Sequence, residues 1–257
     1  MLLTPAPSES LALWEIMRQP LPHHGLVDAW LIRGLSLIAR ARVVTMRGLE
    51  HVCPSRDPFI VALNHSTRIE ALLVPALLIL HRNGRLIHFL ADWNFRLIPG
   101  VGALYRRAET VTVTRKSTRP YVFNVLKPLY RHSLSVIERT RVHLVAGRSV
   151  GIFPEGTVNR DPRRLMGGRK GAAYLSLITG APVVPVGIRF PDTRDGLPAS
   201  ERDRMEVVIG AALSPPPLAT RISPSTLDAW HAAVMNEIAR LSGKLWLPKV
   251  VRTHEQT

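Results

Sequence analysis

The stretch from Phe59 to Glu70 constrains this chain more than any other, because it reads as a buried strand, a polar turn and a helix start. Five consecutive apolar residues from Phe59 to Leu63 predict a central strand that is covered on both faces. Asn64 and His65 follow this strand directly, at the point where open α/β sheets place their sites. The sequence therefore predicts a functional site at the carboxyl end of this strand.

Glu70 follows His65 by five residues, a spacing that does not put both side chains on one helix face. The two can meet if His65 lies in the turn and Glu70 in the first helical turn. The carboxylate would then hold one imidazole nitrogen while the other faces a substrate. A structural interpretation is also open, because Thr67 to Glu70 matches a capping box in which Glu70 bonds back to the Thr67 amide.

Strand and helix patterns alternate along the chain. Strands are expected at residues 43–46, 59–63, 86–91, 111–114, 149–153, 182–190 and 205–209. Helical spacing is expected at 26–42, from the His65 turn to residue 80, at 120–146 with a break near Pro128, at 172–179 and at 227–245. This alternation predicts an α/β fold, with a mostly parallel central sheet covered by helices and an N-terminal amphipathic helical segment.

Composition narrows the choice of partners. The chain has 34 Lys and Arg against 19 Asp and Glu, a net charge of +15, which favours nucleic acid, an anionic membrane surface or phosphorylated substrates. The arginines are scattered and no common nucleic-acid-binding motif occurs, so no nucleic acid partner is expected. A single cysteine, Cys53, excludes an internal disulfide, and the spacing of cysteine and histidine predicts no metal site.

The predicted 26–42 helix has one apolar face, which carries Val27, Trp30, Leu31, Gly34, Leu35 and Ile38. That face can pack on the core, or it can lie in a membrane interface with Trp30 and arginines at the headgroup level. The longest clean apolar run, residues 71–80, falls well short of the roughly 20 residues that span a bilayer, so no transmembrane helix is expected.

Four ordered motifs resemble those of the glycerolipid acyltransferases, and most closely the bacterial 1-acylglycerol-3-phosphate acyltransferases. They are Asn64-His65-x4-Glu70, the Pro99 to Gly102 loop leading to Arg115, Phe153-Pro154-Glu155-Gly156-Thr157, and Val184-Pro185-Val186. Their order and spacing match as well as the motifs, and the likeness covers about residues 43 to 212. It divides the chain into an N-terminal arm and amphipathic helix, 1–42, and an acyltransferase domain, 43–257.

The resemblance implies a mechanism. His65 would act as general base on the hydroxyl of a lysophospholipid, which attacks the thioester of acyl-CoA or acyl-carrier protein, and Glu70 would orient His65. Arg115 would bind the acceptor phosphate. Asn64, Glu155, Gly156, Thr157 and Arg160 would complete the substrate site. The leading acceptor is 1-acylglycerol-3-phosphate, which gives phosphatidic acid, and neither a metal nor another cofactor is expected.

Three positions depart from the family pattern. Glu70 stands where Asp is usual, Val158 where Arg is common although Arg160 is retained, and Asp92 in a segment that is usually basic. Two alternatives therefore stay open: an acyltransferase for a non-phosphatidate acceptor, and a catalytically weak lipid-binding relative. If the acceptor lies in a membrane, the basic surface would bind that membrane, because anionic headgroups attract each Lys or Arg by about 1 kcal/mol. We expect a cytoplasmic protein, peripheral on the inner face of the cell membrane.

Overall fold

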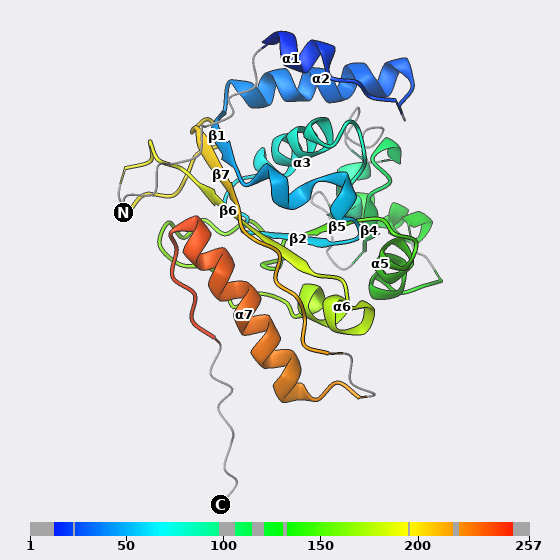
Figure 1. Cartoon of the computed structure of the whole chain (residues 1–257), viewed down its shortest axis with the longest axis vertical. Helices are drawn as coiled ribbons and strands as arrows, with labels where there is room; N and C mark the ends of the chain where they lie inside the picture. The colour runs from blue at the N-terminus through cyan, green and yellow to red at the C-terminus, as the bar shows by residue number, and fades with distance from the viewer. Residues whose placement is uncertain are drawn as a thin grey trace, which may run out of the picture.

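A seven-stranded sheet forms the central layer of the protein, and the predicted Phe59–Leu63 strand lies in its middle (Figure 1). This computed structural model describes residues 13–22, 24–97, 106–114, 121–130, 133–194, 196–217 and 221–248. Its strands are β1 (Val43–Arg47), β2 (Ile60–Leu63), β3 (His88–Asp92), β4 (Val111–Val113), β5 (Val150–Ile152), β6 (Val183–Arg189) and β7 (Met205–Ile209).

The strand order is β1-β7-β6-β2-β5-β3-β4. All neighbouring strands are parallel except β6 and β7, which are antiparallel, so β1 and β7 run against the other five. The predicted mostly parallel sheet is therefore confirmed. Because β2 and β5 are parallel neighbours, the residues that follow them lie at the same edge of the sheet.

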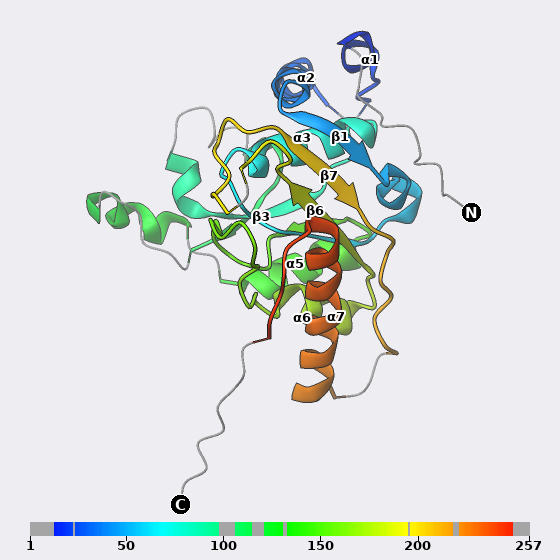
Figure 2. The same cartoon turned by 90° about the vertical axis from the view of Figure 1, so that its left-hand side faces the viewer.

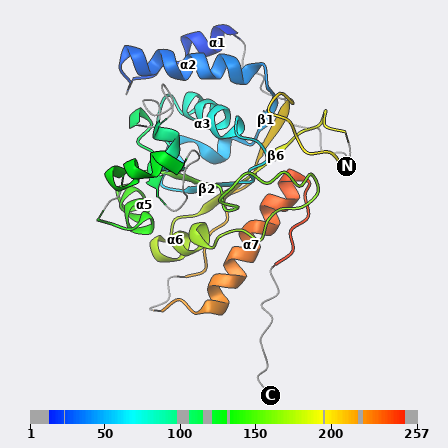
Figure 3. The same cartoon turned by 180° about the vertical axis from the view of Figure 1, so that it is seen from behind.

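Helices cover both faces of the sheet (Figures 1 and 3). They are α1 (Leu13–Arg18), α2 (Leu26–Arg40), α3 (Glu70–His81), α5 (Val136–Val145), α6 (Gly171–Thr179) and α7 (Pro224–Ser242). Short 3₁₀ segments are η1 (Leu49–Val52), η2 (Pro54–Arg56), η3 (Trp93–Leu97) and η4 (Tyr121–Tyr130). One face carries α3 with α2 and α1 beyond it, and the other carries α5, α6 and α7.

The side chains of β2 alternate between these two helical layers. Val61 and Leu63 belong to the cluster that includes α3, whereas Ile60 and Ala62 pack with α6 and α7. All four are fully buried, which explains why the strand has an unbroken apolar sequence. Each large apolar side chain buried in this way contributes about 1.5–3 kcal/mol, and the turn after β2 is thereby fixed to the core.

The predicted 120–146 helix is two elements. η4 ends at Tyr130, and α5 begins after Ser135, whose side chain accepts a hydrogen bond from the Glu138 amide while Glu138 bonds back in a capping box. The last helix begins earlier than predicted, because Ser223 caps it and Pro224 occupies the first helical position. Gly243, at φ 72°, ends α7, whereas the sequence pattern predicted a helix as far as residue 245.

The apolar face of α2 is exposed. The interpretation in which this face packs on the core is therefore wrong. Trp30 is 60% exposed, Val27 58% and Ile38 55%. The helix instead packs on α3 through its buried residues Ala29, Ile32, Ser36 and Ala39. Three of these four side chains are small, and the larger apolar side chains of Val27, Trp30 and Ile38 are left exposed.

The N-terminal segment projects from one end of the molecule (Figure 2). The sequence did not predict α1, although its Ile16 is fully buried in the cluster that joins α1 and α2 to α3. In the described parts of the chain, none of the helices combines the length and apolar character needed to cross a membrane. Residues 1–12 of the predicted N-terminal arm lie outside the described residues.

Candidate active site

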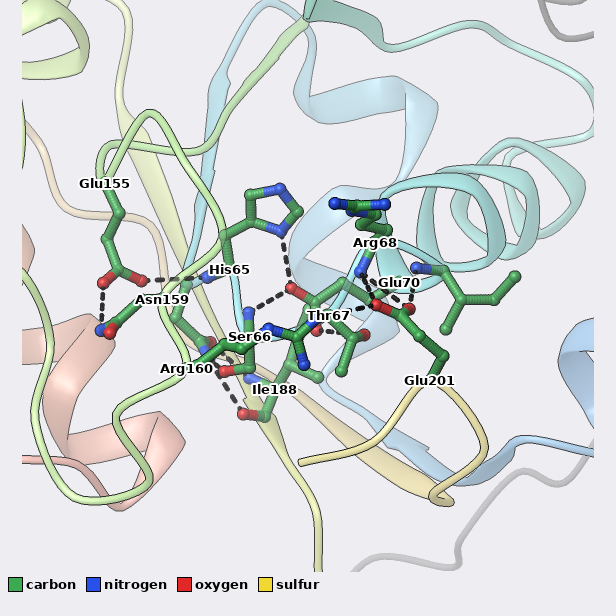
Figure 4. A network of polar contacts seen from close by, with 12 residues as sticks. His65, Ser66, Thr67, Arg68, Glu70, Glu155, Asn159, Arg160, Ile188 and Glu201 are labelled. Atoms are coloured by element: carbon green, nitrogen blue, oxygen red, sulfur yellow. Dashed lines mark hydrogen bonds and ion pairs between the residues drawn. The ribbon is translucent and has the colours of Figure 1, made fainter. Parts of the chain in front are cut away.

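The turn between β2 and α3 brings His65 and Glu70 into contact (Figure 4). The distance from His65 Nδ1 to Glu70 Oε1 is 2.8 Å. Glu70 is the first residue of α3 and is fully buried, and its carboxylate also accepts hydrogen bonds from the Ser66 amide at 2.5 Å and the Thr67 hydroxyl at 3.2 Å. The carboxylate therefore orders the turn and holds the imidazole at the same time.

This contact sets the protonation pattern of the imidazole. An ionised Glu70 can only accept, so Nδ1 carries the hydrogen and Nε2 keeps a free lone pair. Burial raises the pKa of the Glu70 carboxyl, and the hydrogen bond from His65 opposes this shift. The His65 ring lies on Phe153 at 4.5 Å between centroids, and no described residue hydrogen-bonds to its Nε2. Nε2 points away from Glu70 (Figure 4) and is available to a substrate proton.

Asn64, at the end of β2, bonds to the backbone of β6. Its Oδ1 accepts a hydrogen bond from the Ile188 amide at 2.7 Å, and its Nδ2 donates to the Ile188 carbonyl at 3.0 Å. The side chain is buried, and it extends the pairing of β2 with β6 by one residue. This placement suits positioning of the turn rather than direct contact with a substrate.

Glu155, in the turn after β5, holds the backbone on either side of the site (Figure 4). Its buried carboxylate accepts hydrogen bonds from the His65 amide at 3.0 Å, the Asn159 side chain at 2.6 Å and the Met166 amide at 2.8 Å. The backbone N–H of Asn159 donates a hydrogen bond to the His65 carbonyl at 2.7 Å. The backbone of His65 is thereby held from both its amide and its carbonyl.

Gly156, Thr157 and Arg160 continue this turn toward the open side. Gly156 has φ 68°, a backbone conformation that favours glycine, and a Cβ there would lie 2.6 Å from the Arg169 side chain, which would have to move. Thr157 is exposed, and Arg160 forms an ion pair with Glu201 at 3.5 Å. Arg115 and the Pro99–Gly102 loop lie outside the described residues, so their roles stay predictions.

A large open pocket of about 1930 Å³ lies in front of His65. Its lining includes apolar side chains from α2, α3 and η4, among them Leu31, Leu35, Leu72, Phe123 and Leu126. Its lining also includes the basic side chains of Arg68, Arg107, Arg160, Arg169 and Lys170. His65, Gly156, Thr157 and Arg160 face this pocket, whereas Asn64 and Glu155 are not among its lining residues.

No sequence pattern pointed to Glu201, which comes from the loop between β6 and β7. Its carboxylate accepts hydrogen bonds from the Arg68 amide at 2.9 Å and the Ile69 amide at 3.0 Å, at the start of α3. A carboxylate is favoured at a helix N-terminus, so Glu201 stabilises the start of α3 as well as pairing with Arg160. The position of Asn159, four residues after Glu155, can be read from the sequence. Its hydrogen bond to His65 cannot, because that bond depends on how the two turns pack.

The donor set suits proton transfer. Across the described residues, no group of three or more His, Cys, Asp and Glu side chains is arranged to hold a metal ion. The site instead offers one oriented imidazole, a buried carboxylate behind it and cations beside a pocket with an apolar wall. Such a set can deprotonate a hydroxyl next to an anionic group on an amphiphilic molecule.

Comparison with known proteins agrees with this geometry. Residues 43–189 match the sequence model of the family described as Acyltransferase. The chain is 25% identical over 164 residues to the chloroplastic 1-acyl-sn-glycerol-3-phosphate acyltransferase BAT2 of Brassica napus, and 26% identical over 164 residues to the Arabidopsis thaliana protein LPAT1, which carries the same description. Each alignment covers 64% of this chain but 41% and 40% of those proteins, so the chain spans about two fifths of their length.

A solved structure shares the fold. The 1-acyl-sn-glycerophosphate (LPA) acyltransferase PlsC from Thermotoga maritima superposes with a TM-score of 0.55 at 18% identity, covering 90% of this chain and 88% of that one. At this identity the likeness concerns the fold alone. The family match is the stronger finding, because it spans more than half of the chain and includes the His65 and Glu155 turns. The protein belongs to the acyltransferase family.

Proposed function

We propose that the protein transfers a fatty acyl group from acyl-CoA or acyl-carrier protein to the free hydroxyl of a lysophospholipid. The preferred acceptor in this proposal is 1-acylglycerol-3-phosphate, which gives phosphatidic acid, as in the descriptions of the plant relatives. The observation that carries the proposal is the 2.8 Å contact between His65 Nδ1 and Glu70, which leaves Nε2 available at the pocket.

In the proposed reaction, His65 Nε2 removes the proton of the acceptor hydroxyl as its oxygen attacks the thioester carbonyl carbon. The C–O bond forms, the C–S bond breaks, and the leaving thiolate receives from the imidazolium the proton that came from the hydroxyl. Glu70 stabilises the transient positive charge on His65 and keeps Nε2 aimed at the pocket. A general base of this kind contributes about 10²- to 10⁴-fold to the rate, and the two half-steps need no covalent acyl-enzyme.

The lining of the pocket supports an amphiphilic acceptor. Its apolar wall suits an acyl chain, and its cations suit a phosphate. Arg107 is paired with Asp28, and Lys170 with Asp228. Arg68 and Arg169 form no ion pair with another described residue, which leaves their guanidinium groups available to a phosphate, together with the predicted Arg115.

One observation favours the alternative of a different acceptor. Arg160 is already paired with Glu201, and Asp92 also lines the pocket, so two carboxylates lower the positive potential where a phosphate would bind. A lysolipid with a less negative headgroup would tolerate these carboxylates better than lysophosphatidate does.

The direct test is thiol release from acyl-CoA and from acyl-carrier protein across a panel of lysolipids. We expect turnover with lysophosphatidate to exceed turnover with lysophosphatidylcholine and with monoacylglycerol, because two of the pocket arginines are free to bind a phosphate. Turnover with a neutral or zwitterionic acceptor alone would keep the reaction and replace the acceptor. Absence of thiol release from every pair, with folded protein, would favour the lipid-binding alternative.

We further propose that the exposed face of α2 binds an anionic membrane surface, on the inner face of the cell membrane. The exposed Trp30 and Leu31 lie on this face, and Leu31 also lines the pocket, so the face is continuous with the pocket wall. The net charge of +15 supplies attraction to anionic headgroups. Bound in this way, the pocket would receive an acceptor without its leaving the lipid layer.

Replacing Trp30 and Leu31 with Glu should weaken binding to phosphatidylglycerol-containing vesicles about 100-fold, because two interfacial apolar contacts are lost. Vesicle co-sedimentation measures the loss. The matched control replaces Val142 and Val145 with Glu, since these two α5 residues are also exposed, at 53% and 71%, and lie on the opposite face of the sheet. Equal binding by both double variants would contradict a specific role for α2.

A further inference from the structure

Lys244 reaches the inner side of the His65 turn from the far end of the chain. It follows α7 and lies outside the 43–189 family match. Its Nζ donates hydrogen bonds to Ser66 Oγ at 3.0 Å and to the Asp161 carbonyl at 2.8 Å. Since the Ser66 amide donates to Glu70, contacts run from Lys244 through Ser66 to the carboxylate that holds His65.

The backbone around Lys244 is fixed in this position. Gly243 ends α7 in the left-handed region, and the Lys244 amide donates to the Ala239 carbonyl. Leu245 then bonds to the loop after Glu155, donating to the Arg163 carbonyl and accepting from the Leu165 amide at 2.8 Å in each case. Lys244 is therefore held where its side chain meets both the turn after β2 and the loop after β5.

The charges around Lys244 give it an electrostatic effect on the site. Glu70 of α3, Glu155 of the turn after β5 and Asp161 of the following loop face it, and burial lowers the pKa of Lys244 while these carboxylates oppose that shift. Within the described chain, neither Glu70 nor Glu155 forms an ion pair with a lysine or arginine. On the pocket side, the charged neighbours of the His65 turn are Arg68, Arg160, Arg169 and Glu201.

We propose that Lys244 is a positioning residue for the acyl transfer: its hydrogen bonds hold Ser66 against the loop after β5, and its positive charge acts on the Glu70 carboxylate that holds His65. This inference rests on the proposed function for its kinetic consequence. Its physical basis is that a buried carboxylate stays charged only where nearby donors and positive charge offset its lost hydration. Lys244 supplies both a hydrogen-bond donor and a positive charge beside this turn.

The test compares Lys244→Met, which removes charge and donor, with Lys244→Arg, which keeps both. Loss of the positive charge favours the protonated form of the Glu70 carboxyl that holds His65, so the acidic limb of the pH profile of kcat/KM moves upward. We expect a shift of about 0.5 to 1 pH unit for Lys244→Met and little shift for Lys244→Arg. Lys244→Gln, neutral but polar, should shift the limb as Lys244→Met does, and it serves where the Met variant fails to fold.

Arg240→Met is the matched control, because it removes one positive charge from the exposed surface of α7, where Arg240 pairs with Glu237. Its acidic limb should stay in place. Histidine NMR titration of the same variants, with His65 identified by its absence in His65→Ala, reports the same shift without any activity. The inference would be overturned if Lys244→Met left both the acidic limb of kcat/KM and the midpoint of the NMR titration unchanged. It would also be overturned if Lys244→Met lowered the rate at every pH without moving the acidic limb.

The proposed function and the role of Lys244 can fail independently of each other. If the wild-type protein releases no thiol with any donor and acceptor, the proposed function fails, while the NMR titration still decides whether Lys244 acts on His65. If thiol release occurs and the titration does not move, the reaction stands and Lys244 has a structural role alone.

Discussion

His65→Ala should lower kcat/KM for acyl transfer by about 10³-fold, because the reaction then loses the only base positioned at the acceptor hydroxyl in the proposed mechanism. The imidazole is held by the contact from Nδ1 to Glu70 at 2.8 Å and lies on the Phe153 ring, and His65 lines the pocket. Removing it takes away the proton acceptor but leaves the pocket walls and the cations. Thiol release from an acyl donor in the presence of lysophosphatidate measures the effect.

Two controls make this result specific. His51→Ala removes another partly exposed histidine, which contacts Glu50 outside the pocket lining, and it should leave the rate unchanged. Far-UV circular dichroism and thermal unfolding should show that His65→Ala remains folded, since the core strands on either side of the turn are intact. A folded His65→Ala protein that keeps more than a tenth of wild-type activity would refute His65 as the general base, because base catalysis is worth about 100-fold or more.

Glu155→Ala should destabilise the protein by about 3 kcal/mol and also reduce activity. The buried Glu155 carboxylate accepts three hydrogen bonds, and its removal leaves the His65 and Met166 amides without these acceptors. Each hydrogen bond to a charged group is worth about 1.5–3 kcal/mol, and part of this loss is recovered by water and relaxation. Urea unfolding, followed by tryptophan fluorescence, measures the change in unfolding free energy.

Glu155→Gln is the informative partner variant, because its amide keeps the shape and one accepting oxygen. It should lose less stability than Glu155→Ala. Thr157→Ala, at an exposed position of the same turn, should change stability by no more than about 0.5 kcal/mol. If Glu155→Ala kept full stability and only raised the KM for the acceptor, Glu155 would contact the substrate directly instead of holding the His65 backbone.

Much of the fold could be predicted from local patterns. Five consecutive apolar residues before Asn64 identified the central strand, because a strand covered on both faces has no polar positions. The alternation of strands with helices predicted the mostly parallel sheet. The exceptions have local causes that pattern reading did not detect, such as Ser223 as the cap of α7 and the separate start of α5 at its Ser135 capping box.

The α2 helix shows where local patterns fail. Its apolar stripe of Val27, Trp30 and Ile38 fits a core-facing helix, yet the structure exposes that stripe and buries Ala29 and Ile32 instead. Periodicity identifies which residues share a face, but the face that is buried depends on the shape of the neighbouring element. Here Ala29 and Ile32 pack on Ile79 and Leu80 of α3, and a larger apolar face of α2 is left exposed.

The sequence by itself determined the strand, the turn and the two residues that meet in it, because His65 and Glu70 lie within one short segment whose geometry is limited by a strand end and a helix start. Only the tertiary structure decided what holds that turn. The residues that bond to it are distant in the sequence. Ile188 bonds to Asn64 across 124 residues, Glu201 to Ile69 across 132, and Lys244 to Ser66 across 178. Such hydrogen bonds depend on how distant elements pack, and no local spacing of residues encodes that packing.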